Sequence, residues 1–195
     1  MDNILKEKYI IISILGSHAG ENAEQIFSRK IHDIQFTGKT FWMIQSHKAN
    51  PNTVQSLYRK SRNENKNVYC FFIEPATMGG ARPTKLSRQA TAFSKDKINW
   101  EPFPSNLSPV TGKIGTNACA LVFDELVLTQ DQIDLNLWNY AEFENHEQPI
   151  FPKLGVSTIC SILKDMSNHP KRIKTNIRKV IAVGKLSELS CVWLK

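Results

Sequence analysis

The chain has no apolar run close to the roughly 18 residues that cross a membrane as a helix. Its longest such run, residues 9–15 (YIIISIL), has the length of a strand. The first nine residues alternate charged and apolar side chains and lack the apolar core of a signal peptide. We therefore expect a cytoplasmic protein without a membrane partner.

The cysteine patterns of disulfide-rich and zinc-binding proteins are also missing. The four cysteines, Cys70, Cys119, Cys160 and Cys191, stand far apart beside apolar neighbours, without close Cys/His pairs. Disulfide frameworks occur mostly in short secreted chains, and zinc ligands usually come in close pairs. We expect four reduced, buried cysteines, no metal and no cofactor.

No catalytic or nucleotide-binding signature is present. The turn at residues 16–20 (GSHAG) matches neither the Gly-x4-Gly-Lys-Ser/Thr loop nor the Gly-x-Gly-x-x-Gly fingerprint. The five histidines form no i,i+4 pair, and no acid stands near them in the order that a triad needs. Glu74 and Asp124-Glu125 are the carboxylates most expected at strand ends, where a carboxylate can serve as a general base. The sequence identifies no catalytic partner for either of them. The sequence leaves open whether the protein is an enzyme.

What the chain does contain is enough for a folded domain. Apolar residues make up 41% and charged residues 22% of its 195 residues, which permits a core and argues against disorder. We expect a single domain over residues 1–195. Residues 76–109, rich in glycine and proline, are expected to form a long loop or insertion with one short element near residues 98–103.

Apolar periodicity and turn residues predict helices early in the chain and mainly strands late. In chain order we expect a strand at 9–15, a helix from 21 to 35 that stops near Gly38, a strand at 40–46, a helix opened by Asn50-Pro51, a strand at 67–75, a strand at 118–128, a helix at 131–143, and strands at 156–163, 180–186 and 191–194. This order favours an α+β fold, with a partly closed mixed β-sheet or small β-barrel and helices packed outside. A doubly wound sheet is the alternative, because the first half reads β-α-β-α-β.

The net charge of +7 is unevenly distributed. Residues 164–185 contain seven basic residues and one acid, whereas residues 114–152 contain seven acids and neither lysine nor arginine. A positive face suits an anionic partner, most often nucleic acid, although a solvated surface that keeps the protein soluble explains it equally well. The acidic residues within 124–147 are a candidate docking surface for a protein partner.

Aromatic and basic side chains are interleaved between residues 39 and 72. They are Phe41, Trp42, Tyr58, Tyr69 and Phe72, with Lys39, Lys48, Arg59, Lys60 and Arg62. Aromatic rings stack on unpaired or flipped bases, and cations hold the flanking phosphates. Phe41 and Trp42 point to opposite faces of a strand, so at most one is buried in a sheet with one covered face. The alternative is that both pack under helices.

Short motifs in this part of the chain resemble the PUA-like superfamily, in particular its EVE and ASCH domains. Residues 41–46 (FWMIQS) are similar to the aromatic strand ending in serine that opens EVE domains, and residues 68–73 resemble the strand that follows. Residues 37–40 (TGKT) resemble the Gly-Lys-Thr strand of ASCH domains, and residues 180–186 distantly resemble a later strand.

The resemblance covers about half of the chain. Lys66-Asn67 stands where the family usually has Gly-Asp, and residues 76–109 have no counterpart. The resemblance implies a small β-barrel whose cleft binds RNA or a modified base. It also implies that Trp42 and Ser46 contact the ligand, with Lys48 beside them.

The leading hypothesis is a domain that binds nucleic acid, either RNA or DNA, or a modified nucleobase, through an aromatic cleft and a basic face. In this hypothesis Trp42 stacks on a base, and Ser46 and Glu74 form hydrogen bonds with the edges of bases. The expected ligand-binding residues are Trp42, Ser46, Lys48, Glu74 and Arg82, and the expected phosphate-binding residues are Lys60, Arg62, Arg172 and Lys174.

The alternative hypothesis is a small enzyme acting on a nucleotide or nucleic acid. Its site lies between Ser17-His18 and the loop from Glu74 to Arg82, at the ends of adjacent parallel strands. His18 and Glu74 are its expected catalytic residues.

Overall fold

The structure, a computed structural model, describes residues 9–15, 21–44, 49–74, 88–141, 147–149, 160–165 and 177–195. The structure does not describe the side chains of residues 136, 139–141, 147–149 and 160–165. The described helices are α1 (Ala23–Thr37), α2 (Pro51–Asn63) and the 3-10 turn η1 (Leu135–Leu137). The described strands are β1 (Tyr9–Ile14), β2 (Thr40–Ile44), β3 (Tyr69–Ile73), β4 (Arg88–Gln89), β5 (Ala92–Ser94), β6 (Glu101–Pro102), β7 (Thr111–Gly112), β8 (Cys119–Leu128), β9 (Gln132–Asp134), β10 (Trp138–Ala141), β11 (Glu147–Pro149), β12 (Cys160–Asp165) and β13 (Ile177–Leu194).

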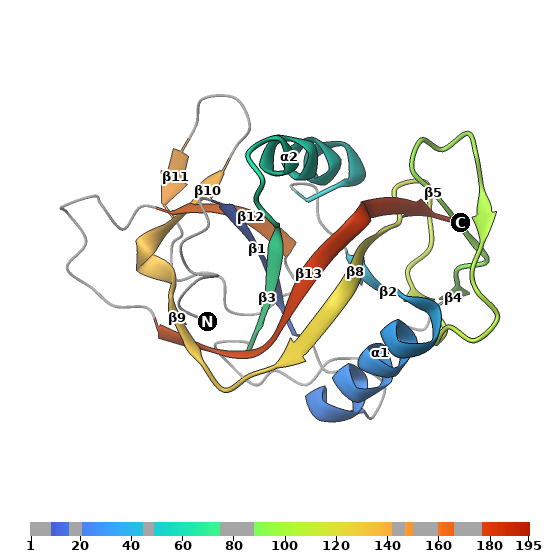
Figure 1. Cartoon of the computed structure of the whole chain (residues 1–195), viewed down its shortest axis with the longest axis horizontal. Helices are drawn as coiled ribbons and strands as arrows, with labels where there is room; N and C mark the ends of the chain where they lie inside the picture. Colours follow the sequence, from blue (N-terminus) through green and yellow to red (C-terminus); the bar gives the residue numbers. More distant parts are fainter. Residues whose placement is uncertain are drawn as a thin grey trace.

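Eleven of these strands form one mixed sheet (Figure 1). Its main path runs β11-β10-β12-β1-β3-β13-β5-β6, with β8 and β9 also paired to β13 and β2 paired to β8. The β1–β3 pair is parallel, and the other described pairs are antiparallel. The predicted α+β class with a mixed sheet is confirmed. The described strands form an open sheet, not a closed barrel.

The long strand β13 joins the parts of this sheet. Its start pairs with β9, its middle lies between β3 and β8, and its end pairs with β8 and β5. Register shifts after Val180, Lys185 and Leu186 interrupt the pairing, as bulges do when they bend a strand. In Figure 1 it is the red ribbon that crosses the molecule. The two strands predicted at 180–186 and 191–194 are therefore parts of one interrupted strand.

Local capping interactions set the ends of the two α-helices. The Asn22 side chain accepts the backbone N–H of Gln25 in a capping box, and α1 ends at Gly38, which has a φ of 74°. Asn50 caps α2 in the same way, with Pro51 at the first helical position. The predicted boundaries are confirmed within two residues.

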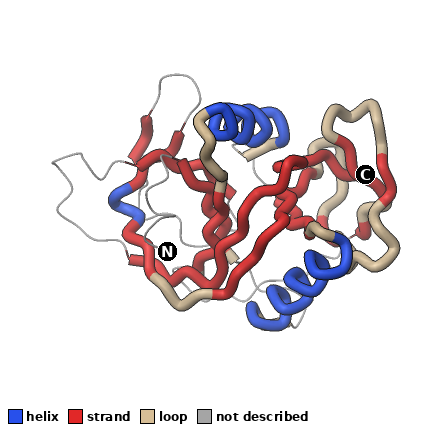
Figure 2. The backbone as a smooth tube through the Cα atoms, viewed as in Figure 1, coloured by secondary structure: helices blue, strands red, loops and turns tan. Residues whose placement is uncertain are grey.

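Both helices cover the same face of the sheet. Phe27 of α1 and Leu57 of α2 belong to one buried cluster with Ile11, Phe72 and Leu121 of the strands. Figure 2 shows the helices lying apart, beside different parts of the strands. Each helix therefore shields its own portion of a shared core.

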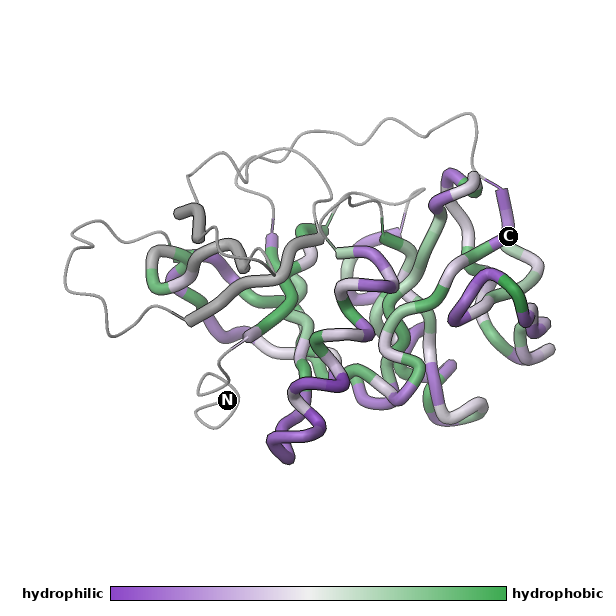
Figure 3. Tube along the Cα trace, turned by 90° about the horizontal axis from the view of Figure 1, so that it is seen from above, coloured by the Kyte–Doolittle hydropathy of each residue, from purple (hydrophilic) through white to green (hydrophobic). Residues whose placement is uncertain are grey.

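Segments other than the two α-helices cover the opposite face. Phe71 of β3 is buried with Leu135 and Trp138 of the β9–β10 segment. Phe41 of β2 is buried with Phe93 and Val110 from residues 88–118. Apolar residues, green in Figure 3, accordingly follow the central strands. Apolar cores thus lie on both faces of the sheet.

One of the predicted helices is wrong. Residues 131–143 were expected to be helical, but residues 132–141 form β9, η1 and β10, because β9 pairs with β13 and β10 with β12. Residues 88–109 were expected to be mostly loop with one short element near residues 98–103, and they contain the short strands β4, β5 and β6, of which β6 lies in that range. They also bury Ala90 and Phe93 against β2 and β8. Residues 76–87 of the predicted loop lie outside the described residues.

Other predictions concern membranes and thiols. In the described part of the chain, no helix has the length and apolar character needed to span a bilayer. Cys70, Cys119 and Cys191 are buried, as predicted, and these three thiols are not joined in disulfides. The side chain of Cys160 lies outside the described side chains.

Candidate ligand-binding site

Trp42 packs in an aromatic cluster beneath α1. Its ring stacks on Phe27, with centroids 5.5 Å apart and planes 9° apart, and its centroid lies 4.6 Å from that of Phe72. Phe41 points to the opposite face, as predicted, and packs against Phe93. Because both faces of the sheet are covered, both residues contribute to packing. Trp42 as a whole residue is nevertheless only half-buried.

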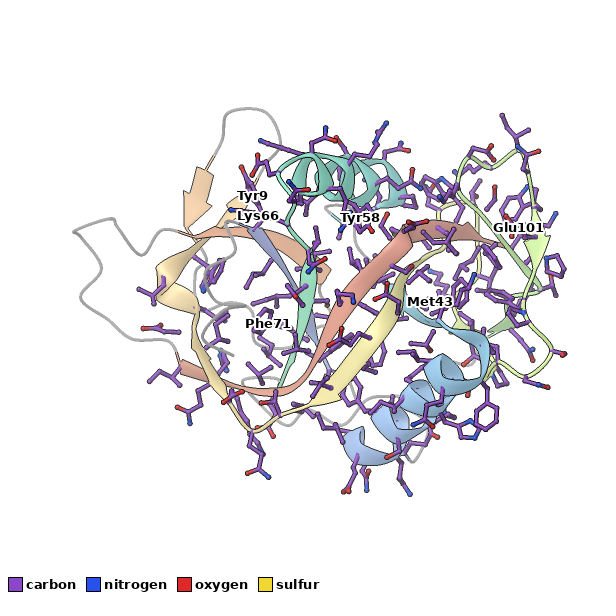
Figure 4. All side chains as sticks on the ribbon, viewed as in Figure 1. Tyr9, Met43, Tyr58, Lys66, Phe71 and Glu101 are labelled. Carbon is purple, nitrogen blue, oxygen red and sulfur yellow. The ribbon has the colours of Figure 1, made fainter. Side chains whose placement is uncertain are left out.

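A pocket of about 110 Å³ opens beside this ring. Its walls come from the residues before and within α1, from β2, and from the segment leading into β7. They are Glu21, Ile26, Arg29, Lys30, Phe41, Trp42, Met43, Pro109, Val110 and Thr111. Figure 4 labels Met43 on this wall. A closed apolar cavity of about 150 Å³ holds a benzene ring, so this open pocket suits a single ring or a group of similar size.

Arg29 and Glu21 form an ion pair at the pocket wall. Arg29 Nη2 donates to Glu21 Oε2 at 2.7 Å, and Arg29 Nε donates to Glu21 Oε1 at 3.3 Å. This two-point geometry is the one that guanidinium groups use to bind carboxylates and phosphates. Both side chains are partly exposed. An anion that entered the pocket would compete with Glu21 for the same guanidinium.

Lys30 is the buried cation of the pocket. Its side chain is 6% exposed, and its Nζ lies 3.5 Å from Asp33 Oδ2. Burial lowers the pKa of Lys30 to about 8, because the charged ammonium loses its hydration. The Asp33 and Glu21 carboxylates act in the opposite direction, and the Arg29 guanidinium lowers the pKa further.

Asp33 has two hydrogen-bond donors besides Lys30. Thr40 Oγ1 donates to its Oδ2 at 2.8 Å, and the Ser108 backbone N–H donates to its Oδ1 at 2.8 Å. The carboxylate therefore connects α1 to the first residue of β2 and to the segment before β7. These connections hold together the three parts of the chain that form the pocket.

The predicted phosphate-binding residues of α2 lie elsewhere. Lys60 Nζ is 5.5 Å from the centroid of the Tyr9 ring. Lys60 and Arg62 are exposed in the last turn of the helix. Figure 4 shows Tyr9 well separated from Met43 on the pocket wall. The structure does not bring Lys60 to the Trp42 pocket.

Glu74 follows β3 directly. The strands β1 and β3 are adjacent and parallel, and Leu15 N donates to Ile73 O at 3.0 Å. The strand ends of the alternative site are therefore neighbours, as predicted. The Glu74 carboxylate itself is exposed and lies 3.3 Å from Lys179 Nζ, which is the geometry of a surface ion pair.

The remaining predicted site residues lie outside the described residues. They are Ser17, His18, Ser46, Lys48, Arg82, Arg172 and Lys174. Where residues are described, no group of three or more His, Cys, Asp and Glu side chains is arranged to hold a metal ion.

Sequence reasoning missed the charged residues of the pocket. Lys30 and Asp33 lie on α1 among positions that bury Ile26 and Phe27. Two opposite charges three residues apart on the apolar side of a helix are the signal that would have identified them, because charges are rarely buried unless paired.

Comparison of the chain with models of protein families, with curated proteins and with solved structures gives no significant match. The resemblance to PUA-like domains stays a prediction based on the short motifs.

Proposed function

We propose that the protein binds nucleic acid or a modified nucleobase, and that the pocket beside Trp42 receives one base or the phosphate next to it. The observation that supports this proposal is an open pocket whose wall combines a half-buried tryptophan with two cations, Arg29 and Lys30. Nucleotides carry a flat apolar ring close to an anion, and this wall offers a partner for each.

The packing of Trp42 limits how a base can bind. Phe27 stacks on its ring, so a full sandwich that used both faces of Trp42 would have to displace Phe27. A base is therefore expected to contact the accessible part of the indole while Arg29 holds the phosphate. In this arrangement Trp42 contributes apolar contact, and charge supplies much of the affinity.

The basic residues of α2 have a secondary role in this proposal. Arg59, Lys60 and Arg62 are exposed, and the chain has a net charge of +7. They attract a polyanion over a longer range and contribute to salt dependence without reading a base.

The test is a titration with single- and double-stranded DNA and RNA at two salt concentrations, followed by tryptophan fluorescence. Binding that weakens steeply with salt is expected. R29Q is expected to weaken binding by at least about tenfold, since charge-assisted hydrogen bonds contribute about 1.5–3 kcal/mol each. W42F, which retains an aromatic ring, should lose most of the ligand-dependent quenching.

The matched control is K95Q, which removes one positive charge at an exposed residue just after β5 that does not line the pocket. Its affinity should stay within about twofold of the wild type at physiological salt, where distant charges are screened. Absence of binding to all four nucleic acids at low salt, or equal losses in R29Q and K95Q, would overturn the proposal.

A further inference from the structure

We propose that Lys30 is a nucleophilic amine, and that it forms an imine with the open-chain aldehyde of a sugar phosphate held in the pocket beside Trp42. The inference rests on the pocket of the proposed function and adds a covalent step to it. Two sources offer this chemistry: a free sugar phosphate, and an abasic position within a nucleic acid strand.

The position of Lys30 supports a reactive role. Lys30 lines the pocket and its side chain is 6% exposed, so the residue borders a cavity while its amine is largely removed from bulk water. Lysines desolvated in this way are the ones that act as nucleophiles toward carbonyl compounds. With a pKa of about 8, roughly a tenth of the amine is neutral at pH 7.

The hydrogen bonds of Asp33 allow Lys30 to become neutral. A buried carboxylate with lysine as its sole partner would hold the ammonium in its charged form, because an unpaired buried charge is costly. Asp33 instead keeps the Thr40 hydroxyl and the Ser108 backbone N–H as donors when Lys30 loses its proton. The carboxylate therefore does not depend on Lys30 alone.

The other walls indicate the class of ligand. Arg29 offers a two-pronged donor to a phosphate, once that anion displaces Glu21. The open pocket of about 110 Å³ suits a group of the size of one sugar. An aldehyde carried on a sugar next to a phosphate places its carbonyl carbon within the same small pocket as Lys30.

The chemical step needs no oxidant or reductant. The lone pair of neutral Nζ attacks the aldehyde carbon, and the carbonyl electron pair moves to oxygen, giving a carbinolamine. That intermediate loses one water, made of the former carbonyl oxygen and the two protons that neutral Nζ carried. The product is an imine between Nζ and the sugar carbon, and the reaction is reversible.

The test traps the imine with cyanoborohydride, which reduces it to a stable secondary amine. The full chain is incubated either with ribose 5-phosphate or with an oligonucleotide that contains one abasic site, and the modified lysine is located by peptide mass spectrometry. We expect a single main adduct at Lys30, whose rate rises about tenfold per pH unit below pH 8 and then levels off. The faster of the two reagents identifies the source of the aldehyde.

K30R keeps the positive charge and should abolish the adduct, whereas K113R, at an exposed lysine, should leave it unchanged. Circular dichroism of K30R checks that the variant folds. If K30R does not fold, the pH profile of labelling at Lys30 in the wild type tests the inference instead. Labelling spread evenly over the lysines, or labelling of Lys30 with the pH profile of an ordinary lysine, would overturn the inference.

Binding of an intact oligonucleotide, measured in parallel, separates the two proposals. Binding without trapping at Lys30 contradicts the imine alone. Trapping of ribose 5-phosphate without binding of any nucleic acid contradicts the proposed function and leaves the reactive lysine in place.

Discussion

Asp33 in α1 accepts a 2.8 Å hydrogen bond from the hydroxyl of Thr40, the first residue of β2. Both side chains are buried, and they lie on either side of the turn at Gly38. The bond fixes the direction in which β2 leaves the helix. It therefore sets the position of Trp42 relative to Arg29 and Lys30, which is the arrangement that defines the pocket.

Replacing Asp33 by alanine should destabilise the protein strongly. D33A leaves the Lys30 ammonium buried without its carboxylate, and removing one partner of a buried pair costs roughly 3–5 kcal/mol. The exposed pair provides the control, since E21A should cost less than about 1 kcal/mol. Urea denaturation measures both, and similar losses in the two variants would contradict the role given to Asp33.

The stability of the protein should depend on Lys30 at alkaline pH. The pKa of this residue is about 8 in the folded chain, below its ordinary value of 10.5, so between these values the unfolded chain binds a proton that the folded chain has released. The free energy of unfolding must then rise with pH across that window, by up to roughly 3 kcal/mol, and fall as pH returns toward 8.

The comparison with K30M isolates this effect from other titrating groups such as Tyr58, whose pKa burial raises. The difference in unfolding free energy between wild type and K30M, measured by urea denaturation from pH 7.5 to 10.5, should grow with pH. A difference that stays constant would show that Lys30 titrates at its ordinary pKa.

Gly184 should not tolerate a side chain. A Cβ at this position of β13 would lie 2.7 Å from Phe123 Cδ1 and 3.1 Å from Leu126 Cδ1. Forcing extra volume into a packed core costs about 1–3 kcal/mol, so G184A should lower the unfolding free energy by that amount. In the F123L background the loss should shrink, because the clashing ring is gone.

Gly115 offers the matched control, since a Cβ there meets no atom within 4 Å. G115A should change the unfolding free energy by less than about 0.5 kcal/mol. Equal effects of G184A and G115A would indicate that Phe123 moves aside without cost.

Asp96 should hold the turn after β5 in shape. Its Oδ1 accepts from the Ile98 and Asn99 backbone N–H groups and from the Ser94 hydroxyl. These bonds favour the carboxylate and hold the pKa of Asp96 far below its usual range. D96A should accelerate hydrogen exchange of the Ile98 and Asn99 amides, whereas D96N, which keeps one acceptor oxygen, should do so less. The turn should also persist in the wild type at pH values where ordinary aspartates are protonated.

The sequence predicted those elements whose signals are local. Asn22, Gly38 and Asn50 mark helix ends through their own hydrogen bonds and backbone preferences, so α1 and α2 were found within two residues. The helix predicted for residues 131–143 was wrong over residues 132–141 because apolar spacing in a short segment suits a helix or a strand equally well. Their pairing with β13 and β12, distant in the chain, decided the outcome.

The candidate site was less predictable for a similar reason. Trp42 was found because aromatic residues on a strand stand out, but its packing on Phe27 depends on how α1 crosses β2. Lys30 and Asp33 can be recognised as part of a site only from the hydrogen bonds that Thr40 and Ser108 donate to Asp33. Ser108 is 75 residues from Asp33 in the chain. No local pattern contains that contact.

The strand β13 has a consequence for how the protein is made. Without it, the pairs described above separate into one group around β1 and β3, a β2–β8 pair and a β5–β6 hairpin. A ribosome must therefore deliver residues 177–194 before these groups can join, and until then the apolar faces of β3 and β8 lack their shared neighbour. Joining the groups thus requires contacts between residues far apart in the chain, and such contacts form slowly during folding.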